Sequence, residues 1–306
     1  MSSTQAAAAE TMDSCASCGT TAIDDVKLKK CACKLVQYCS VDCQKNHRPQ
    51  HKRLCRKRMA ELRDERLLEQ PDSSCYGDCP ICCLPLLIGP AKSNMMDCCS
   101  KRICQGCHVA NMKREFEGRL EHRCAFCRHP LVQSEEELYK MVMKRVKKND
   151  PVAMRSMGKK NHKEGNYESA IRYWTRAAEL GDAEAHYELS ITYRDGEGVE
   201  KDEKKAIYHT EEAAIGGHPE ARHNLGCKEG NKRRFERAKK HFIIAANLGD
   251  HGSLKMLKKL YSDGHASKED YAGALRAYQV AVDAMKSAER EKAEEAIKNG
   301  GVNCIM

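Results

Sequence analysis

The second half of the chain repeats one helical pattern of apolar and polar positions. Alanine-rich segments end in glycine at RAAELGD (176–182), EEAAIGGH (211–218) and IAANLGD (244–250), with a weaker echo in QVAVDAM (279–285). Their alanines step by 36, 32 and 36 residues: Ala177, Ala213, Ala245 and Ala281. The preceding helix starts step by 32, 36 and 32: Ala153, Ala185, Ala221 and Ser253. This periodicity predicts a solenoid of helical hairpins, with Gly181, Gly217 and Gly249 as helix C-caps.

The turn in the second of these units has a specific composition. Its sequence, YRDGEGVEKDEKKA (193–206), resembles the Gly-x-Gly-Val turn of Sel-one-like repeats, which are relatives of tetratricopeptide repeats. The resemblance implies about four repeats over residues 150–286 and a concave surface for a protein partner. The aromatic residues available to that surface are Tyr167, Tyr173, Trp174, Tyr187, Tyr193, Tyr208 and Tyr278.

Further helices flank the repeats. Residues 56–70 have helix-forming composition and stop before Pro71, and residues 70–78 read as a separating linker. Residues 287–306, rich in Glu, Lys and Ala, are expected to form a C-terminal helix and tail.

Residues 134–149 predict another helix. Ser134 and Glu137 have the spacing of a capping box, and Leu138 and Val142 start an apolar face that ends before Pro151. We expect this helix to dock the cysteine-rich part of the chain against the repeats.

Cysteines dominate the first half, where the helical pattern is absent. Seventeen of the 19 cysteines lie between Cys15 and Cys127, a density more typical of metal binding than of disulfides in a reducing compartment. The first set has eight potential ligands in four pairs: Cys15, Cys18, Cys31, Cys33, Cys39, Cys43, His51 and Cys55. Eight ligands predict two tetrahedral zinc sites, and so short an apolar-poor segment needs them in order to fold.

The string YCSVDCQKNHRPQHKRLC (38–55) closely resembles the C-terminal half of the MYND zinc finger. The resemblance covers residues 15–55 and implies that alternate pairs share an ion. One ion would take Cys15, Cys18, Cys39 and Cys43, and the other Cys31, Cys33, His51 and Cys55. The single residue between Cys31 and Cys33 departs from the family pattern, so His47 is an alternative ligand. The family implies a peptide groove at Gln44 and Arg48, although Arg48 replaces the usual tryptophan.

A second set of eight thiols follows: Cys79, Cys82, Cys98, Cys99, Cys104, Cys107, Cys124 and Cys127. They again predict two closed zinc sites, which leave no coordination position for hydrolytic chemistry.

This second pattern resembles an all-cysteine RING finger over residues 75–133, with Lys101 where the usual histidine stands. The resemblance implies a cross-brace in which Cys79, Cys82, Cys104 and Cys107 bind one ion and Cys98, Cys99, Cys124 and Cys127 the other. Because Cys98 and Cys99 are adjacent, Asp97 or His108 are alternative ligands, while Cys75 and Cys83 read as ordinary thiols. A stripe of Val109, Met112, Phe116 and Leu120 predicts the central helix, packed between the zinc loops.

Ubiquitin-ligase RING fingers contact the ubiquitin-conjugating enzyme and ubiquitin at two positions that read Ile81 and Arg128 here. The resemblance therefore implies ligase activity by positioning, without a catalytic nucleophile. Ala125 stands where active RING fingers very often have proline. A non-catalytic scaffold is the alternative.

Composition and charge narrow the remaining classes. With 41% hydrophobic and 32% charged residues the chain is too apolar for general disorder, and no run is long enough to span a bilayer. The N-terminus has no secretory pattern, so we expect an intracellular protein, cytoplasmic or nuclear, with residues 1–14 disordered. No phosphate loop or hydrolase motif is evident.

The formal charge of +9 raises nucleic-acid binding as a third hypothesis. If 15 cysteines and one histidine bind four zinc ions, however, the charge falls to about +2. Only the basic stretch 45–58 then favours nucleic acid, and a solvated helix face is the preferred interpretation of that stretch. The sequence thus predicts a multidomain chain: two small zinc-stapled α+β fingers of cross-brace type, then an all-α solenoid, acting as an intracellular protein-interaction adaptor.

Overall fold

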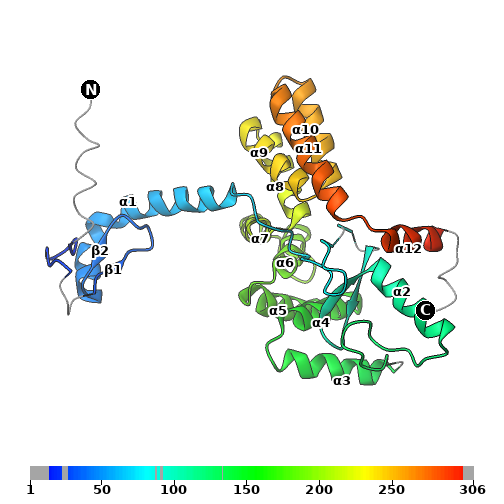
Figure 1. Cartoon of the computed structure of the whole chain (residues 1–306). Helices are drawn as coiled ribbons and strands as arrows, with labels where there is room; N and C mark the ends of the chain where they lie inside the picture. Colours follow the sequence, from blue (N-terminus) through cyan, green and yellow to red (C-terminus); the bar gives the residue numbers. More distant parts are fainter. Residues whose placement is uncertain (1–13, 23–26, 87, 90–91, 133, 299–306) are drawn as a thin grey trace. The chain divides into compact units, whose positions relative to one another are not determined.

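The computed structural model describes residues 14–298, apart from 23–26, 87, 90–91 and 133. The chain forms two compact units, Met1–Glu69 and Gln70–Met306 (Figure 1). The N-terminal segment expected to be disordered lies outside the described residues except for Ser14, which instead forms an isolated β-bridge with Thr21.

Unit 1 is a small finger with one long helix. Strands β1 (Lys29–Lys30) and β2 (Gln37–Tyr38) pair antiparallel, and α1 (Val41–Leu67) follows them. Ser40 caps α1 by accepting a 3.1 Å hydrogen bond from the N–H of Cys43. The helix expected at 56–70 is the C-terminal half of α1. The buried core consists of Tyr38 and three cysteines, so burial of apolar side chains is too small to hold this unit together.

Unit 2 begins with the second cysteine-rich finger. Strands β3 (Ser93–Met96) and β4 (Lys101–Cys104) form an antiparallel hairpin in the register Met96↔Lys101, and α2 (Gln105–Glu117) follows directly. Leu86 and Ile103 pack with the cysteines in its buried core.

The stripe expected to pack between the zinc loops is wrong in its second half. Phe116 is 73% exposed and Leu120 is 50% exposed, whereas Gly106 and Glu115 are the buried residues of α2. The reason is a long-range contact: helix α12 (Ala288–Lys298) packs against α2 and takes the face that contains Gly106 (Figure 1).

Helix α3 (Glu135–Val146) joins the finger to the solenoid. Its Val142 packs against Ala153 and Met157 of the next helix, and Arg145 donates 2.8 Å hydrogen bonds to Ser100 and Asp150. The expected capping box is wrong, because the Ser134 side chain makes no capping hydrogen bond. Three glutamates in the first turn favour this helix end through its dipole instead.

The solenoid stacks four antiparallel helix pairs, seen from green to orange in Figure 1. They are α4 (Pro151–Lys163) with α5 (Tyr167–Glu179), α6 (Ala183–Asp195) with α7 (Glu203–Ile215), α8 (Pro219–Asn231) with α9 (Phe235–Asn247), and α10 (His251–Ser262) with α11 (Lys268–Ala284). The first helix of every pair has a side-chain N-cap, from Asp150, Asp182, His218 and Asp250. Gly181, Gly217 and Gly249 follow helix ends with φ of 88°, 80° and 93°, which glycine adopts without strain.

Small residues let the paired helices cross closely. A Cβ at Gly158 would lie 2.3 Å from Nε1 of Trp174, and one at Gly226 would lie 2.6 Å from Phe242. Trp174 is therefore a core residue, only 2% exposed, and not part of an aromatic surface. Tyr167 and Tyr208 do remain exposed.

Residues 70–78, expected to form a separating linker after the helix of the first finger, follow the boundary between the two units and contact the repeats. The N–H of Cys75 donates a 3.0 Å hydrogen bond to the carbonyl of Gly217, and the Tyr76 hydroxyl donates to Glu220. Nearby, Nη2 of Arg102 in β4 donates to both carboxylate oxygens of Glu184, at 2.9 and 2.8 Å. The finger and the repeats are thus joined by buried polar contacts within unit 2.

None of the helices in the described part of the chain has the length and apolar character needed to cross a membrane.

Candidate metal centres

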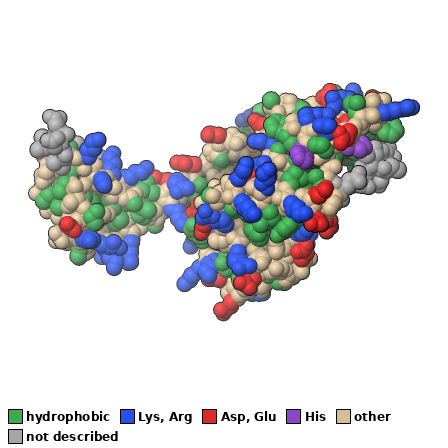
Figure 2. Space-filling model, turned by 90° about the horizontal axis from the view of Figure 1, so that it is seen from below, with side chains coloured by type: hydrophobic (Ala, Val, Ile, Leu, Met, Phe, Trp, Pro, Cys, Tyr) green, Lys and Arg blue, Asp and Glu red, His purple; other side chains and the backbone are tan. Residues whose placement is uncertain are grey.

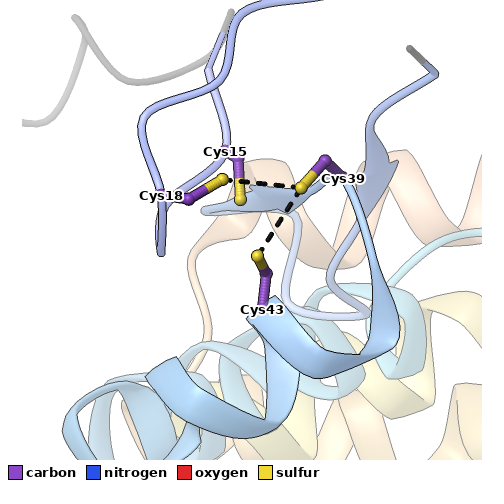
Figure 3. Close-up of side chains that lie close together, drawn as sticks. All are labelled: Cys15, Cys18, Cys39 and Cys43. Atoms are coloured by element: carbon purple, nitrogen blue, oxygen red, sulfur yellow. Dashed lines mark hydrogen bonds between the residues drawn. The ribbon is translucent and has the colours of Figure 1, made fainter.

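The first centre lies in unit 1, where Cys15 and Cys18 meet Cys39 and Cys43 (Figure 3). Cys39 and Cys43 flank the start of α1, and the Cys39 Sγ lies 3.5 Å from the Sγ atoms of both Cys18 and Cys43. The two ligands Cys39 and Cys43 thus lie about one helical turn apart, on either side of the N-cap residue Ser40.

The second centre brings together Cys31, Cys33, His51 and Cys55. Cys33 Sγ lies 3.1 Å from Nε2 of His51, and Cys31 Sγ lies 3.7 Å from Cys55 Sγ. A tight turn accommodates the single residue between Cys31 and Cys33: the N–H of Lys34, at φ 62°, bonds the carbonyl of Cys31.

The alternative ligand His47 lies outside that group. Its Nδ1 is 3.0 Å from the Tyr38 hydroxyl and its ring stacks on His51. His47 therefore packs against the ring of the ligand His51 and is not itself one of the four ligands.

The third centre consists of Cys79, Cys82, Cys104 and Cys107 in unit 2. Backbone N–H groups point at its sulfur atoms, from Cys104 to Cys79 and from Cys107 to Cys104, both at 3.4 Å. Burial raises the pKa of Cys79, but hydrogen bonds from the backbone of Cys104, Cys82 and Ile81 lower it to about 7 overall. Such N–H donors favour the thiolate that a metal binds.

The fourth centre consists of Cys98, Cys99, Cys124 and Cys127. Adjacent Cys98 and Cys99 both serve because they occupy the tip of the β3–β4 hairpin, where Ser100 adopts φ 52°. Their Sγ atoms lie 3.4 Å from Cys127 and 3.9 Å from Cys124, respectively. The alternatives Asp97 and His108 are not in the group.

All four groups fit Zn²⁺. In each, the four ligand atoms lie within 4.8 Å of one another. Tetrahedral zinc with bonds of about 2.3 Å to sulfur requires sulfur atoms about 3.8 Å apart. The close sulfur pairs span 3.4 to 3.9 Å. Soft thiolates with one imidazole are the donor set that zinc prefers, and four ions per chain would fill the groups.

The pKa values of the cysteine ligands also favour a bound cation. Hydrogen bonds with the Cys18 and Cys43 side chains raise the pKa of Cys39 to about 12, although hydrogen bonds from the backbone lower that of buried Cys15 to about 6 against the effect of burial. The raised pKa of Cys39 disfavours four neighbouring thiolates, and a divalent ion bound there would supply the balancing positive charge.

The two positions implied to contact the ubiquitin machinery lie at the zinc loops. Ile81, inside the first cysteine pair of the finger, is 41% exposed. The Arg128 side chain, just after the last cysteine, is 42% exposed and donates 2.8 Å to Asn111 and 3.5 Å to Glu115. These two hydrogen bonds use two of the five N–H donors of the guanidinium.

Glu115 is an organising residue that the sequence pattern missed. Only 1% exposed, it accepts a hydrogen bond from the backbone N–H of Arg123, and His122 and Arg128 approach it. Burial raises its pKa, but these partners and Asn111 lower it overall. The Glu115 carboxylate thus links α2 to the last zinc loop. In the sequence, the basic residues around Cys124 were the available sign that an acidic partner lies nearby.

Arg290 of α12 is a second residue that the sequence pattern missed, and no local pattern pointed to it. It donates to the carbonyls of Pro85, Leu84 and Met285, at 2.7, 3.1 and 2.6 Å. Its Nη2 also lies 3.4 Å from Sγ of the ligand Cys82. The last helix thereby supports the third centre.

In unit 1 the implied groove residues lie one turn apart on α1. Gln44 and Arg48 are both exposed there. Figure 2 shows patches of Lys and Arg side chains on this unit beside hydrophobic ones, and most residues of the basic stretch 45–58 are exposed on α1.

Comparisons with known proteins agree with this architecture. Residues 15–55 match the MYND finger family, and residues 151–182, 183–218 and 219–250 each match the Sel1 repeat. An uncharacterised protein of Neisseria meningitidis serogroup B is 32% identical over 113 residues, which are 36% of this chain and 24% of the relative. The chain thus spans about a quarter of that relative's length.

Two solved structures are similar to part of the chain. A Sel1 repeat protein from Oxalobacter formigenes has 25% identity and a TM-score of 0.43, covering 59% of this chain and 72% of that chain. A protective antigen of uropathogenic Escherichia coli with an SLR fold has 20% identity and a TM-score of 0.42, covering 56% of this chain and 37% of that chain.

The matched repeats end at residue 250, and α10 with α11 adds a fourth helix pair beyond them. The chain therefore contains a segment that matches the MYND finger and three that match the Sel1 repeat.

Proposed function

We propose that the second finger is a RING-type module and that the chain is a ubiquitin ligase adaptor. In this function the finger recruits a ubiquitin-conjugating enzyme, and the repeats and the MYND finger select the substrate. The grouping of the cysteine pairs carries the proposal. The first pair shares a centre with the third and the second pair with the fourth, and along the sequence α2 begins at the third pair and ends before the fourth.

The surroundings of Ile81 and Arg128 support it. Ile81 presents apolar surface beside the third centre, where an enzyme can bury it. The Arg128 guanidinium is held by Asn111 and Glu115 at the fourth centre. A guanidinium fixed in this way can hold two carbonyl groups at once and restrain a thioester-linked ubiquitin in a reactive pose.

The test is discharge of ubiquitin from a panel of thioester-charged conjugating enzymes by the zinc-loaded full chain. We expect acceleration that is lost in Ile81→Ala and in Arg128→Ala. The control is Arg119→Ala, which removes another arginine of the finger, at the end of α2. Zinc content and circular dichroism of each variant separate loss of contact from loss of folding.

No acceleration with any enzyme, from protein that contains about four zinc ions, would overturn the ligase function and favour the non-catalytic scaffold. In that outcome all three modules bind proteins only. Nucleic-acid binding by the stretch 45–58 is tested by measuring the affinity for DNA or RNA at increasing salt concentrations. If the basic residues contact phosphates, this affinity should fall steeply.

A further inference from the structure

Outside the metal centres, one cysteine of the repeats lies in a hydrogen-bonded group of nucleophilic type. Cys227 Sγ lies 3.5 Å from Nε2 of His223, one turn away on α8. The opposite ring nitrogen, Nδ1, lies 2.8 Å from the Ser253 hydroxyl and 3.4 Å from the Asp250 carboxylate. A thiol, an imidazole and a carboxylate thus follow one another in the order used to activate cysteine nucleophiles.

The repeat architecture fixes this geometry. Asp250 is the N-cap of α10 and accepts a hydrogen bond from the N–H of Ser253, so its carboxylate cannot swing away without uncapping the helix. The first turn of α10 lies against the His223 ring, because a Cβ at Gly252 would be 3.4 Å from it. Phe242 of α9 lines another side with an uncharged ring. The titratable groups in contact with His223 are therefore Cys227 and Asp250.

We propose that Cys227 is a nucleophilic cysteine activated by its neighbour His223, and that it is a site of covalent oxidation by hydrogen peroxide. Hydrogen bonds to Asp250 and Cys227 raise the pKa of His223 to about 10, consistent with an imidazolium at neutral pH. Cys227 is half-buried, packed at the edge of a core cluster and not enclosed within it.

The reaction balances with the groups present and one peroxide. The Cys227 sulfur attacks one peroxide oxygen, so an S–O bond forms and the O–O bond breaks. The leaving hydroxide takes a proton from His223 and departs as water. The thiolate is oxidised by two electrons to a sulfenic acid, the peroxide is reduced to water, and His223 ends neutral.

The test follows Cys227 by itself in the full, zinc-loaded chain. Peroxide is added at about pH 6.5, sulfenic acid is trapped with dimedone, and the tryptic peptide 223–228 is quantified by mass spectrometry. We expect Cys227 to be labelled about tenfold faster in the native chain than in the chain unfolded in urea. His223→Gln should lose this advantage, whereas His251→Gln, which changes a neighbouring exposed histidine, should keep it.

Two results would overturn the proposal. One is labelling in the native wild type no faster than in the unfolded chain, which needs no variant to decide. The other is a rate in folded His223→Gln equal to that of the wild type. Labelling of the zinc-binding cysteines does not enter the measurement, because the peptide 223–228 contains Cys227 alone.

Discussion

Arg290 donates a 2.7 Å hydrogen bond from Nη1 to the main-chain oxygen of Pro85, 205 residues earlier in the sequence. The contact places the last described helix on the loop that follows the first cysteine pair of the second finger. Helix α12 can also approach α2 closely because residue 106 is glycine. A Cβ at Gly106 would lie 2.8 Å from the backbone nitrogen of Arg290.

Arg290→Ala should weaken zinc binding at the third centre only. The arginine orients the Leu84–Pro85 loop and lies beside the ligand Cys82, and loss of such outer contacts typically costs 10- to 100-fold in metal affinity. Zinc transfer to a chromophoric chelator should show one of about four ions leaving earlier. Lys292→Ala, at an exposed position of the same helix, is the control and should leave all ions as in the wild type.

Gly158→Ala should destabilise the solenoid by about 1–3 kcal/mol, because the new Cβ would overlap the Trp174 ring in a packed core. Gly273→Ala is the matched substitution in α11, where an added Cβ meets nothing within 4 Å. It should stabilise by up to about 1 kcal/mol through helix propensity. Urea unfolding followed by far-UV circular dichroism measures both, and equal shifts of the two midpoints would contradict the packing argument.

The solenoid should lose stability as the pH falls from about 6.5 to about 4, in part through His218. Burial lowers the pKa of His218 to about 4, and its Nδ1 accepts the capping hydrogen bond of Ala221, which requires the neutral ring. The unfolded chain takes up this proton near the ordinary pKa of about 6.5, so acid favours unfolding across that window.

His218→Asn keeps a capping side chain and removes the titration. We expect it to flatten the dependence of the unfolding midpoint on pH between about 6.5 and 4 relative to the wild type. His251→Asn, at an exposed position, should leave that dependence as it is. The same slope in His218→Asn and wild type would show that other groups cause the acid sensitivity.

Chelation of zinc should unfold the fingers and spare the repeats. The core of unit 1 is built from its own cysteines, whereas α4–α11 bury alanine, leucine and aromatic side chains. Trp174, the single tryptophan, lies in the buried core of the first repeats and reports on them alone. Chelator should therefore lower far-UV ellipticity while Trp174 fluorescence stays near its native value. A fluorescence change as large as that of full unfolding would show that the repeats depend on the metal.

Local patterns determined much of this protein. The alanine-rich segments, their steps of 32 and 36 residues and the glycines that end them predicted the solenoid, because each repeat is one helical hairpin that contacts only its neighbours along the chain. The cysteine pairs likewise predicted the metal groups, since paired ligands form half-sites locally. The RING-type function of the second finger stays a prediction.

Only the tertiary structure decided the contacts between distant segments. The α12 helix returns to α2, and this buries Gly106 and leaves Phe116 exposed, which the helical period of α2 alone did not reveal. His223 and Cys227 are one turn apart in any helix, but Asp250 reaches them only because the next repeat stacks its N-cap there. The helices of a repeat follow from interactions between residues close together in the sequence. Which faces of two elements meet depends instead on packing between residues far apart in the chain.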